Sequence, residues 1–366
     1  MISPSGLRED GSRWERSGGA PLTTVTVVMP VYNESTSIDE SLASVLSQDY
    51  PEDLVEILIA DGGSQDGTVE RIGRVIAGNP ERHIRLLNNP RRTAGAALNL
   101  MIREAAGEIV VRVDGHAEIA HDYVRSCVQV LKTSDALNVG GCISTAGFGF
   151  MGGAIAAALG SFWGNGGARF RSRPADEAEY VDTVPLGAWR RETFDRLGSF
   201  EEWRVNEDCE FNARILQAGG RILLHPRIKA TYFSRRSLRS LAQQYFQYGR
   251  LKCRVIACHP RQLRVRQVVP LAFVLMLLAV FLTERLTRTN TPLLLIASIG
   301  YLFTIGIASV PAAFRARQPG YTLALPAVFA TLHLSYGIGA LLGSAELLLE
   351  SVFARLTRLR PVALRR

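Results

Sequence analysis

The sequence has little cysteine, and its cysteines are not spaced as a structural set. An odd, scattered set without a C-x-x-C pair argues against a disulfide framework and against a zinc site. Such cysteines suit a reducing compartment such as the cytosol. Five occur in the 366 residues: Cys127, Cys142, Cys209, Cys253 and Cys258.

Two nucleotide-binding motifs and an apolar leader are also absent. No G-x-G-x-x-G follows the first predicted strand and no P-loop motif G-x-x-x-x-G-K-[ST] occurs, which argues against dinucleotide-binding and P-loop folds. Residues 1–21 are polar, rich in Ser, Gly and Arg, and contain no apolar run. We therefore expect neither a signal peptide nor an anchor there, and we predict a disordered tail.

Two acidic motifs each follow a short run of apolar and β-branched residues. These motifs are PVYNE at residues 30–34 and DGGSQDGT at residues 61–68. The runs are typical of buried parallel strands, and open α/β sheets bind ligands beyond the carboxyl ends of their strands. We therefore expect Glu34 and Asp61 to lie in one site, where a carboxylate can hydrogen-bond a nucleobase or ribose. Helix caps and turns explain either motif alone, but not both in this order.

A third predicted strand, residues 84–87, precedes two arginines and a helix. Arg91 and Arg92 come just before the helix predicted over residues 93–104, which Thr93 can cap. A guanidinium at a helix start can form paired hydrogen bonds with a phosphate. Arg91 or Arg92 is thus a candidate phosphate ligand, although an exposed loop arginine explains the pattern almost equally well.

These ordered motifs resemble those of glycosyltransferase family 2, and the resemblance continues through AGAALN at residues 94–99. It implies a GT-A fold, which is an α/β architecture with a Rossmann-like, mostly parallel sheet. It also implies transfer of a sugar from a nucleotide diphosphate with inversion. The resemblance assigns nucleotide-sugar binding to Pro30, Tyr32, Glu34, Asp61, Arg92 and Asp114.

The fourth predicted strand, residues 108–113, ends in Asp114-Gly115-His116. The family usually has Asp-x-Asp here, whose carboxylates hold a divalent cation against the diphosphate. This chain keeps Asp114 and has His116 in the second position, so the resemblance implies a metal site made by both residues. An imidazole is an acceptable ligand for Mn²⁺ and a poorer one for Mg²⁺, so we expect a divalent cation that is Mn²⁺ or Mg²⁺.

A further acidic cluster, NEDCE at residues 206–210, precedes a helix predicted over residues 211–218. It resembles the family's Glu-Asp motif, in which the Asp is the general base. An acceptor hydroxyl is a weak nucleophile, so attack on the anomeric carbon gains from proton removal. The resemblance therefore makes Asp208 the base, with Glu207 orienting it or contacting the acceptor. Both acids would also favour a helix N-terminus electrostatically.

Two segments are candidates for the acceptor side of the site. Trp189 lies where the family places sugar contacts and can stack on a pyranose ring, although a buried core tryptophan is equally consistent. Processive family members carry Gln-x-x-Arg-Trp. Here Gln244 is followed by Gln247 and Tyr248 in place of Arg-Trp. This difference argues against a processive synthase, and we assign Gln244 and Arg250 to acceptor binding.

Three apolar runs follow the α/β region, at residues 268–282, 292–314 and 321–349. The second and third exceed the roughly 18 to 20 residues needed to cross a bilayer. The first, of about 15 residues, suits a tilted span, a re-entrant segment or an interfacial helix. Another uncharged stretch, residues 142–168, holds eight glycines, and we predict a flexible segment beside the lipid surface rather than a span.

A basic segment, residues 234–267, contains nine Lys and Arg residues and no Asp or Glu. Such a run before a membrane segment marks the cytoplasmic side and attracts anionic lipids at about 1 kcal/mol per residue. No RNP-type motif or helix-turn-helix accompanies it, so we predict no nucleic-acid partner. We expect Arg261, Arg264 and Arg266 to contact the lipid-linked acceptor. The Arg-rich C-terminus favours an even number of crossings, with the first run re-entrant.

The expected domain organisation is a tail (1–21), a GT-A domain (22–233), a basic interface segment (234–267), membrane helices (268–350) and a basic tail (351–366). Within the family, the pattern resembles bacterial exopolysaccharide enzymes of the succinoglycan glucosyltransferase type. That resemblance implies UDP-glucose as donor and a polyprenyl-pyrophosphate-linked saccharide as acceptor, at the inner membrane with the catalytic domain in the cytosol. The alternatives are a processive polysaccharide synthase and a non-catalytic membrane scaffold with a degenerate transferase domain.

Overall fold

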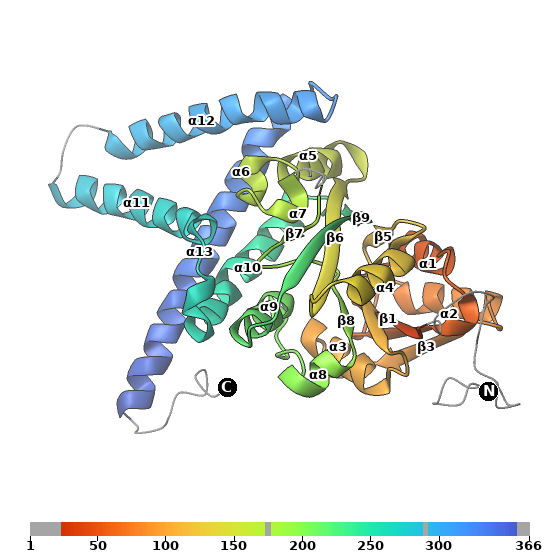
Figure 1. Ribbon diagram of the computed structural model, residues 1–366. Coiled ribbons are helices and arrows are strands. Elements are labelled where there is room, and N and C mark those ends of the chain that lie inside the picture. The colour runs from red at the N-terminus through yellow and green to blue at the C-terminus, as the bar shows by residue number, and fades with distance from the viewer. Residues whose placement is uncertain (1–22, 173–176, 288–291, 357–366) are drawn as a thin grey trace, which may run out of the picture. The chain divides into compact units, whose positions relative to one another are not determined.

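The computed structural model describes residues 23–172, 177–287 and 292–356 and divides them into two units (Figure 1). The first unit consists of residues 23–143 and 177–232. The second consists of residues 144–172, 233–287 and 292–356. The expected N-terminal tail and the last ten residues of the C-terminal tail lie outside the described residues. None of the five cysteines forms a disulfide.

One mixed sheet forms the first unit, with the strand order β3-β2-β1-β4-β8-β6-β9-β5 and β7 paired to β9 among the described residues. Strands β1 to β4 pair in parallel, whereas the pairs that β8 makes with β4 and β6 are antiparallel. The α/β prediction is confirmed, but the sheet is mixed rather than mostly parallel. The strands are β1 (Val25–Val31), β2 (Val55–Asp61), β3 (His83–Asn88), β4 (Ile109–Arg112), β5 (Ala117–Ile119), β6 (Asn138–Ala146), β7 (Glu179–Tyr180), β8 (Ala188–Arg190) and β9 (Ile222–Phe233).

The register of the parallel strands places their last residues side by side. Val31 is paired with Asp61, and Asp61 is paired with Asn88. Helical crossovers return each strand in the same direction, as parallel pairing requires. The loops that follow β1, β2 and β3 therefore emerge at one edge of the sheet.

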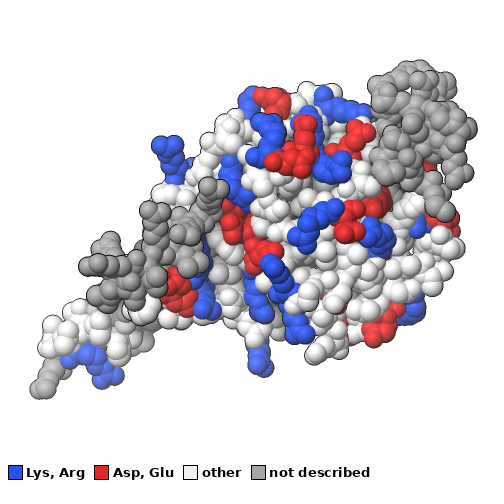
Figure 2. Space-filling view, turned by 90° about the horizontal axis from the view of Figure 1, so that it is seen from below, with Lys and Arg blue, Asp and Glu red and all other residues white. Residues whose placement is uncertain are grey.

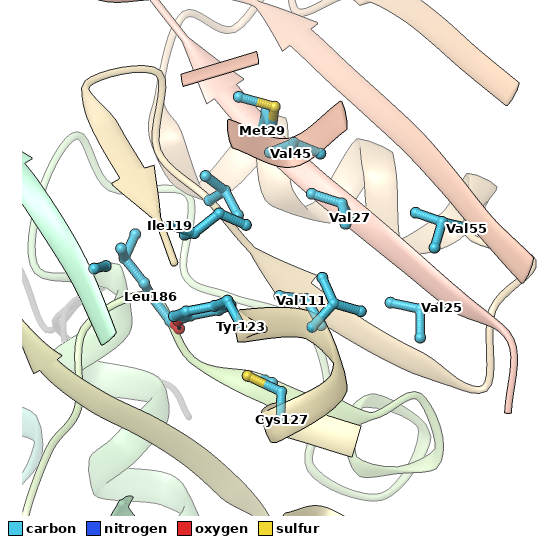
Figure 3. Packing of buried hydrophobic residues seen from close by; sticks show 14 of the residues in the cluster. Val25, Val27, Met29, Val45, Val55, Val111, Ile119, Tyr123, Cys127 and Leu186 are labelled. Carbon is cyan, nitrogen blue, oxygen red and sulfur yellow. Dashed lines mark hydrogen bonds between the residues drawn. The ribbon is translucent and has the colours of Figure 1, made fainter. Parts of the chain in front are cut away.

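The core of the first unit lies between the sheet and its helices (Figure 3). Val27, Met29 and Val111 are inaccessible to solvent on β1 and β4. Tyr123 is buried among them, and its hydroxyl donates a 2.6 Å hydrogen bond to the carbonyl of Leu186, which satisfies a polar group that would otherwise be costly to bury. The helices of this unit are α1 (Ile38–Leu46), α2 (Thr68–Gly78), α3 (Ala94–Glu104), α4 (Tyr123–Thr133), α8 (Glu192–Leu197) and α9 (Glu207–Gln217), with a 3₁₀ turn, η1 (Glu52–Leu54).

The second unit contains three helices that are long and apolar enough to cross a membrane. They are α11 (Val265–Thr287), α12 (Leu293–Arg315) and α13 (Tyr321–Leu356). The first of these helices is longer than the apolar run of about 15 residues, 268–282, that the sequence shows there, and its course as a tilted span, re-entrant segment or interfacial helix stays a prediction. The helix extends beyond the run at both ends to 23 residues, which at 1.5 Å per residue is about 34 Å.

The glycine-containing stretch after β6 is helical rather than flexible. It forms α5 (Gly149–Leu159), α6 (Phe162–Asn165) and α7 (Arg169–Ser172). Helix α5 has 11 residues, too few to cross a bilayer. His333 of α13 forms a 2.8 Å hydrogen bond through Nε2 with the carbonyl of Trp163, and its Nδ1 bonds Tyr301 at 2.9 Å. This stretch therefore packs within the helical unit.

Helix α10 (Leu238–Cys258) packs closely against α13. A Cβ added at Gly339 or Gly343 would lie 2.1 Å from the carbonyl oxygen of Phe246 or 2.2 Å from that of Arg250. The glycines therefore let the two backbones approach closely. A 3₁₀ turn, η2 (Pro260–Gln262), follows α10.

The charged side chains are distributed over the surface. On the face shown in Figure 2, Lys and Arg are interspersed with Asp and Glu and do not form one continuous basic patch.

Candidate active site

The loops after β1 and β2 are joined by reciprocal hydrogen bonds. The backbone N–H of Asn33 donates to Ser64 Oγ at 2.8 Å, and the Asn33 side chain accepts from the backbone N–H of Gln65 at 2.9 Å. The backbone N–H of Glu34 donates to Thr68 Oγ1 at 2.9 Å. The first two acidic motifs thus form one structural unit, because their polar residues satisfy each other's backbone groups.

Asp61 organises the turn that begins the second motif. Its carboxylate accepts from the backbone N–H of Gly63 at 2.9 Å and from Ser64 Oγ at 2.6 Å. Gly63 has a positive φ of 83°, and a Cβ added there would lie 3.2 Å from Arg92 Nε. Arg92 therefore lies beside this turn, whereas Arg91 forms an ion pair with Glu202.

The aromatic ring of Tyr32 is also beside this turn. Tyr32 is 56% exposed, and its ring lies 3.4 Å from a Cβ built on Gly62. Pro30 is partly buried near the end of β1. An exposed aromatic ring next to a buried carboxylate suits stacking on a nucleobase.

The Glu34 carboxylate has His116 as a side-chain partner. Glu34 Oε1 lies 2.8 Å from His116 Nδ1, and Tyr232 contacts the imidazole edge-on with 4.9 Å between ring centroids. Burial disfavours the charged imidazole, but the negative charge of Glu34 outweighs it and raises the pKa of His116 to about 9. This bond joins the first motif to the loop that follows β4.

Arg112, the last residue of β4, lies between two acidic motifs. Its Nε donates to Asp114 Oδ1 at 2.7 Å, and its Nη1 lies 2.9 Å from Glu207 Oε1. Burial would raise the pKa of Asp114, but the Arg112 guanidinium lowers it below its ordinary value. Arg112 is not among the site residues predicted from the sequence, although an arginine inside the otherwise apolar stretch IVVRV, residues 109–113, was a signal for it.

The acidic cluster forms the first turn of α9, which begins at Glu207 rather than at residue 211 as predicted. Asn206 precedes it with a positive φ of 66°, a conformation that Asn tolerates. Glu207 is buried, and burial raises its pKa to about 7 despite the opposing effect of Arg112. Asp208 is only partly buried. The two neighbouring acids therefore have different environments.

Sequence comparison defines the family. The sequence profile described as Glycosyl transferase family 2 matches residues 26–194. A succinoglycan biosynthesis protein, ExoA, from Rhizobium meliloti (strain 1021) is 32% identical over 253 residues, which cover 68% of this chain and 75% of that protein. The chain belongs to glycosyltransferase family 2.

Two further comparisons extend over most of this family 2 chain. A dolichyl N-acetyl-alpha-D-glucosaminyl phosphate 3-beta-D-2,3-diacetamido-2,3-dideoxy-beta-D-glucuronosyltransferase from Methanococcus voltae is 26% identical over 86% of this chain and 95% of its own. The structure of a mannosyltransferase from Pyrobaculum calidifontis, in complex with GDP-Man and Mn²⁺, has a TM-score of 0.55. It is 23% identical over 87% of this chain and 86% of its own, and it shares the GT-A fold.

Trp189 does not have the exposed ring that sugar stacking requires. It is 2% exposed and packs against Phe194, Phe200 and Phe211, with ring centroids 5.7 to 6.2 Å apart. The structure therefore corrects its assignment to acceptor binding. Its place on β8, with the α9 aromatic residue Phe211 against it, makes it a core residue of the glycosyltransferase fold.

The remaining predicted acceptor residues belong to the second unit. Arg250 donates a 3.0 Å hydrogen bond from Nε to Glu346 and forms an ion pair with it at 2.7 Å through Nη2, which links α10 to α13. Gln244 donates to the Tyr248 hydroxyl at 3.2 Å. Arg261 and Arg264 are exposed, and Arg266 packs against Gly166. An acceptor role for these five residues stays a prediction.

Asp114 and His116 fit a divalent cation whose coordination a diphosphate would complete. Asp114 binds Arg112 through Oδ1, and His116 binds Glu34 through Nδ1, so Oδ2 and, in the neutral imidazole, Nε2 would be the atoms that bind a cation. A carboxylate on the other ring nitrogen is typical of metal-binding histidines. Within the described residues, no cluster of three or more His, Cys, Asp or Glu side chains could hold a metal ion. Substrate oxygens would supply the remaining ligands.

Proposed function

We propose that this protein is a membrane-bound, inverting glycosyltransferase that moves glucose from UDP-glucose onto a polyprenyl-pyrophosphate-linked saccharide in exopolysaccharide biosynthesis. The observation that carries the proposal is the connection of Asp114 to the first turn of α9 through Arg112. Through Arg112, Asp114, which would act on the donor, is connected to the helix turn that carries Asp208, which would act as the base for the acceptor. The succinoglycan role in the name of the Rhizobium relative supports the substrate class, as does the lipid phosphate in the name of the Methanococcus relative.

The donor's nucleotide would bind at the joined loops after β1 and β2. Asp61 would accept a hydrogen bond from the base, and the exposed ring of Tyr32 would stack on it. Glu34 would face the ribose while it holds His116. Arg92, beside the Asp61 turn, would form charge-assisted hydrogen bonds with the diphosphate. Asp114 and His116 would hold the cation, which neutralises charge that develops on the leaving diphosphate.

Asp208 would remove the proton of the acceptor hydroxyl. The oxygen then forms its bond to the anomeric carbon as the bond from that carbon to the diphosphate oxygen breaks, and the nucleoside diphosphate leaves with the bonding electrons. Attack opposite the leaving group inverts the anomeric configuration. Glu207 is buried against Arg112, so in this proposal it orients Asp208 and does not take the proton itself.

The helical unit would hold the enzyme at the bacterial inner membrane with the catalytic unit in the cytosol. Helices α11 to α13 are long and apolar enough to cross a bilayer, and the basic segment before α11 favours the cytoplasmic side and anionic lipids. The arginines of this segment would meet the pyrophosphate of the lipid-linked acceptor there.

The test is transfer by the purified full-length enzyme in lipid nanodiscs, supplied with a panel of radiolabelled nucleotide sugars and lipid-extracted acceptors. The proposal predicts one added glucose per acceptor from UDP-glucose, with labelled product in the lipid phase. Long products that grow without release would instead indicate a processive synthase. Absence of transfer from every donor, with UDP binding also absent, would favour a non-catalytic scaffold.

A further inference from the structure

Arg112 is a cation enclosed among acidic groups in the first unit. The residue is 8% exposed, and its strand position is fixed by a 3.0 Å backbone hydrogen bond to the carbonyl of Gly187. Asp114, Glu207 and Asp208 are the negative charges that act on it. A buried arginine is stable only where its charge and its N–H groups are satisfied, and here two different carboxylates satisfy them.

The guanidinium meets its two carboxylates through different nitrogens. Nε donates a hydrogen bond to Asp114, which follows β4 by two residues, and Nη1 forms an ion pair with Glu207 at the start of α9. A guanidinium is planar and holds its donors in a fixed arrangement, whereas a lysine ammonium is a single point of charge. The arrangement therefore fixes the separation of Asp114 and Glu207, which are far apart in the chain.

The carboxylates at both ends have little freedom to move elsewhere. The side chain of Glu207 is 4% exposed, and that of Asp114 is 20% exposed. Asp208 follows Glu207 directly in the first turn of α9. A change in the Arg112–Glu207 bond must therefore move or loosen the helix turn that carries Asp208.

We infer that Arg112 is a positioning residue that couples the donor carboxylate Asp114 to the orientation of Asp208. The inference rests on the proposed function, in which Asp114 acts on the donor and Asp208 on the acceptor. Donor binding at Asp114 and placement of the base are thus linked through one side chain. Without Arg112, a misplaced base reduces the rate of transfer more than it weakens nucleotide binding, by about 100-fold in kcat for a shift near 1 Å.

The alternative is that Arg112 only neutralises the buried charge of Glu207. The double variant R112M/E207Q tests this alternative, because it removes the cation together with the buried anion Glu207 and leaves only Asp114, whose side chain is 20% exposed, without its ion pair. Positioning predicts a thermal unfolding temperature close to that of the wild type, with kcat about 100-fold below that of E207Q. Pure charge neutralisation predicts that the double variant recovers the activity of E207Q, and this result would overturn the inference.

A matched pair on the same helix provides the control. Arg214 bonds Glu210 at 2.8 Å, and the Glu210 side chain is also 4% exposed, but the other hydrogen bonds of Arg214 go to the backbone carbonyls of Leu197 and Ser199 rather than to Asp114. The variant R214M/E210Q should therefore have a kcat close to that of the wild type. R112K keeps the positive charge but lacks the planar guanidinium, so its kcat should stay below that of the wild type.

UDP binding in the presence of Mn²⁺, measured by calorimetry, gives a readout independent of turnover. Replacing Glu207 by Gln removes the charge at one end of Arg112 but leaves an amide oxygen that can accept from the guanidinium, so Arg112 interacts more strongly with Asp114. E207Q should therefore weaken UDP affinity several-fold in the wild-type background and have no effect in the R112M background. Equal effects in both backgrounds would contradict the coupling. Full activity of Asp208→Asn would contradict the proposed function. The comparison of UDP affinities would still test whether Arg112 couples Glu207 to Asp114.

Discussion

At the scale of single residues, the site contains acids with different surroundings. Asp61 is held by its own turn, Glu34 by His116, and Asp114 and Glu207 by Arg112. Each of these carboxylates is thus oriented before any ligand binds. Such preorganisation reduces the reorganisation that a charged transition state would otherwise require.

His116 is expected to decide which cation the site prefers. Replacing it by Asp supplies a harder oxygen ligand and should shift nucleotide binding from Mn²⁺ toward Mg²⁺. Because the new carboxylate would face Glu34, the double variant H116D/E34Q is needed to remove the repulsion. The measurement is UDP affinity in titrations of each cation. A double variant with an unchanged Mn²⁺ to Mg²⁺ ratio would show that His116 does not bind the metal.

The residue scale also shows what sequence can and cannot provide. The motifs predicted that Glu34, Asp61 and Asp114 lie at or just beyond strand ends, and they lie at or beyond the ends of β1, β2 and β4, which pair in parallel and so share one carboxyl edge. The Glu34–His116 and Arg112–Glu207 bonds depend on side-chain directions in three dimensions, which motif spacing does not specify. Trp189 was ambiguous because an aromatic residue suits both a core and a sugar platform.

At the scale of elements, the close contact of α10 and α13 depends on glycine. Arg250–Glu346 and Arg254–Glu350 form ion pairs between these helices, while glycines bring the backbones together. The motif region around Gln244 therefore has a structural role in this pair, whatever its part in acceptor binding. The sequence predicted a membrane helix in the region of α13 and only a basic interface segment in that of α10, and it could not show which glycines face a neighbouring helix.

Gly339→Ala should destabilise the protein even though alanine favours helices more than glycine does. The added Cβ would lie 2.1 Å from the Phe246 carbonyl oxygen, and such overpacking costs about 1 to 3 kcal/mol. Gly306→Ala on α12 is the control, because a Cβ there meets nothing within 4 Å. Thermal unfolding in detergent should show a lower midpoint for Gly339→Ala alone. Equal midpoints for both variants would exclude close packing as the reason for Gly339.

Boundaries of elements were predicted less well than the elements themselves. Strands β3 and β4 begin and end within one residue of the predicted runs 84–87 and 108–113, because short apolar runs bounded by turn residues mark buried strands. Helix α9 starts earlier than predicted because acidic residues are favourable in a first turn. Helix α11 extends through polar residues at both ends, which apolar composition alone does not reveal.

At the scale of the whole molecule, the chain combines a GT-A unit with an apolar helical unit. The basic segment before α11 is expected to contact the lipid-linked acceptor. Replacing Arg261, Arg264 and Arg266 together by Gln should raise the KM for the acceptor several-fold and leave that for the nucleotide sugar nearly unchanged. The effect should diminish at high salt, because screening weakens exposed charge interactions.

A charge-matched variant separates local contact from net charge. Arg74, Arg103 and Arg196 are exposed in the first unit, so R74Q/R103Q/R196Q loses the same charge away from the basic segment. Protease mapping would verify insertion of both variants. An acceptor KM that is unaltered at low and high salt in the correctly inserted R261Q/R264Q/R266Q variant would leave these arginines a purely topological role.

The most direct test of the central claim compares the wild type with Asp208→Asn in transfer from UDP-glucose to the lipid-linked acceptor, with the anomeric configuration of the product determined by NMR. The account predicts a β-linked glucose, inverted relative to the donor, from the wild type. It predicts no transfer by Asp208→Asn, with UDP affinity within a few-fold of the wild type, because loss of a base affects the transition state rather than ground-state binding. An α-linked product, or near wild-type turnover by Asp208→Asn, would contradict it.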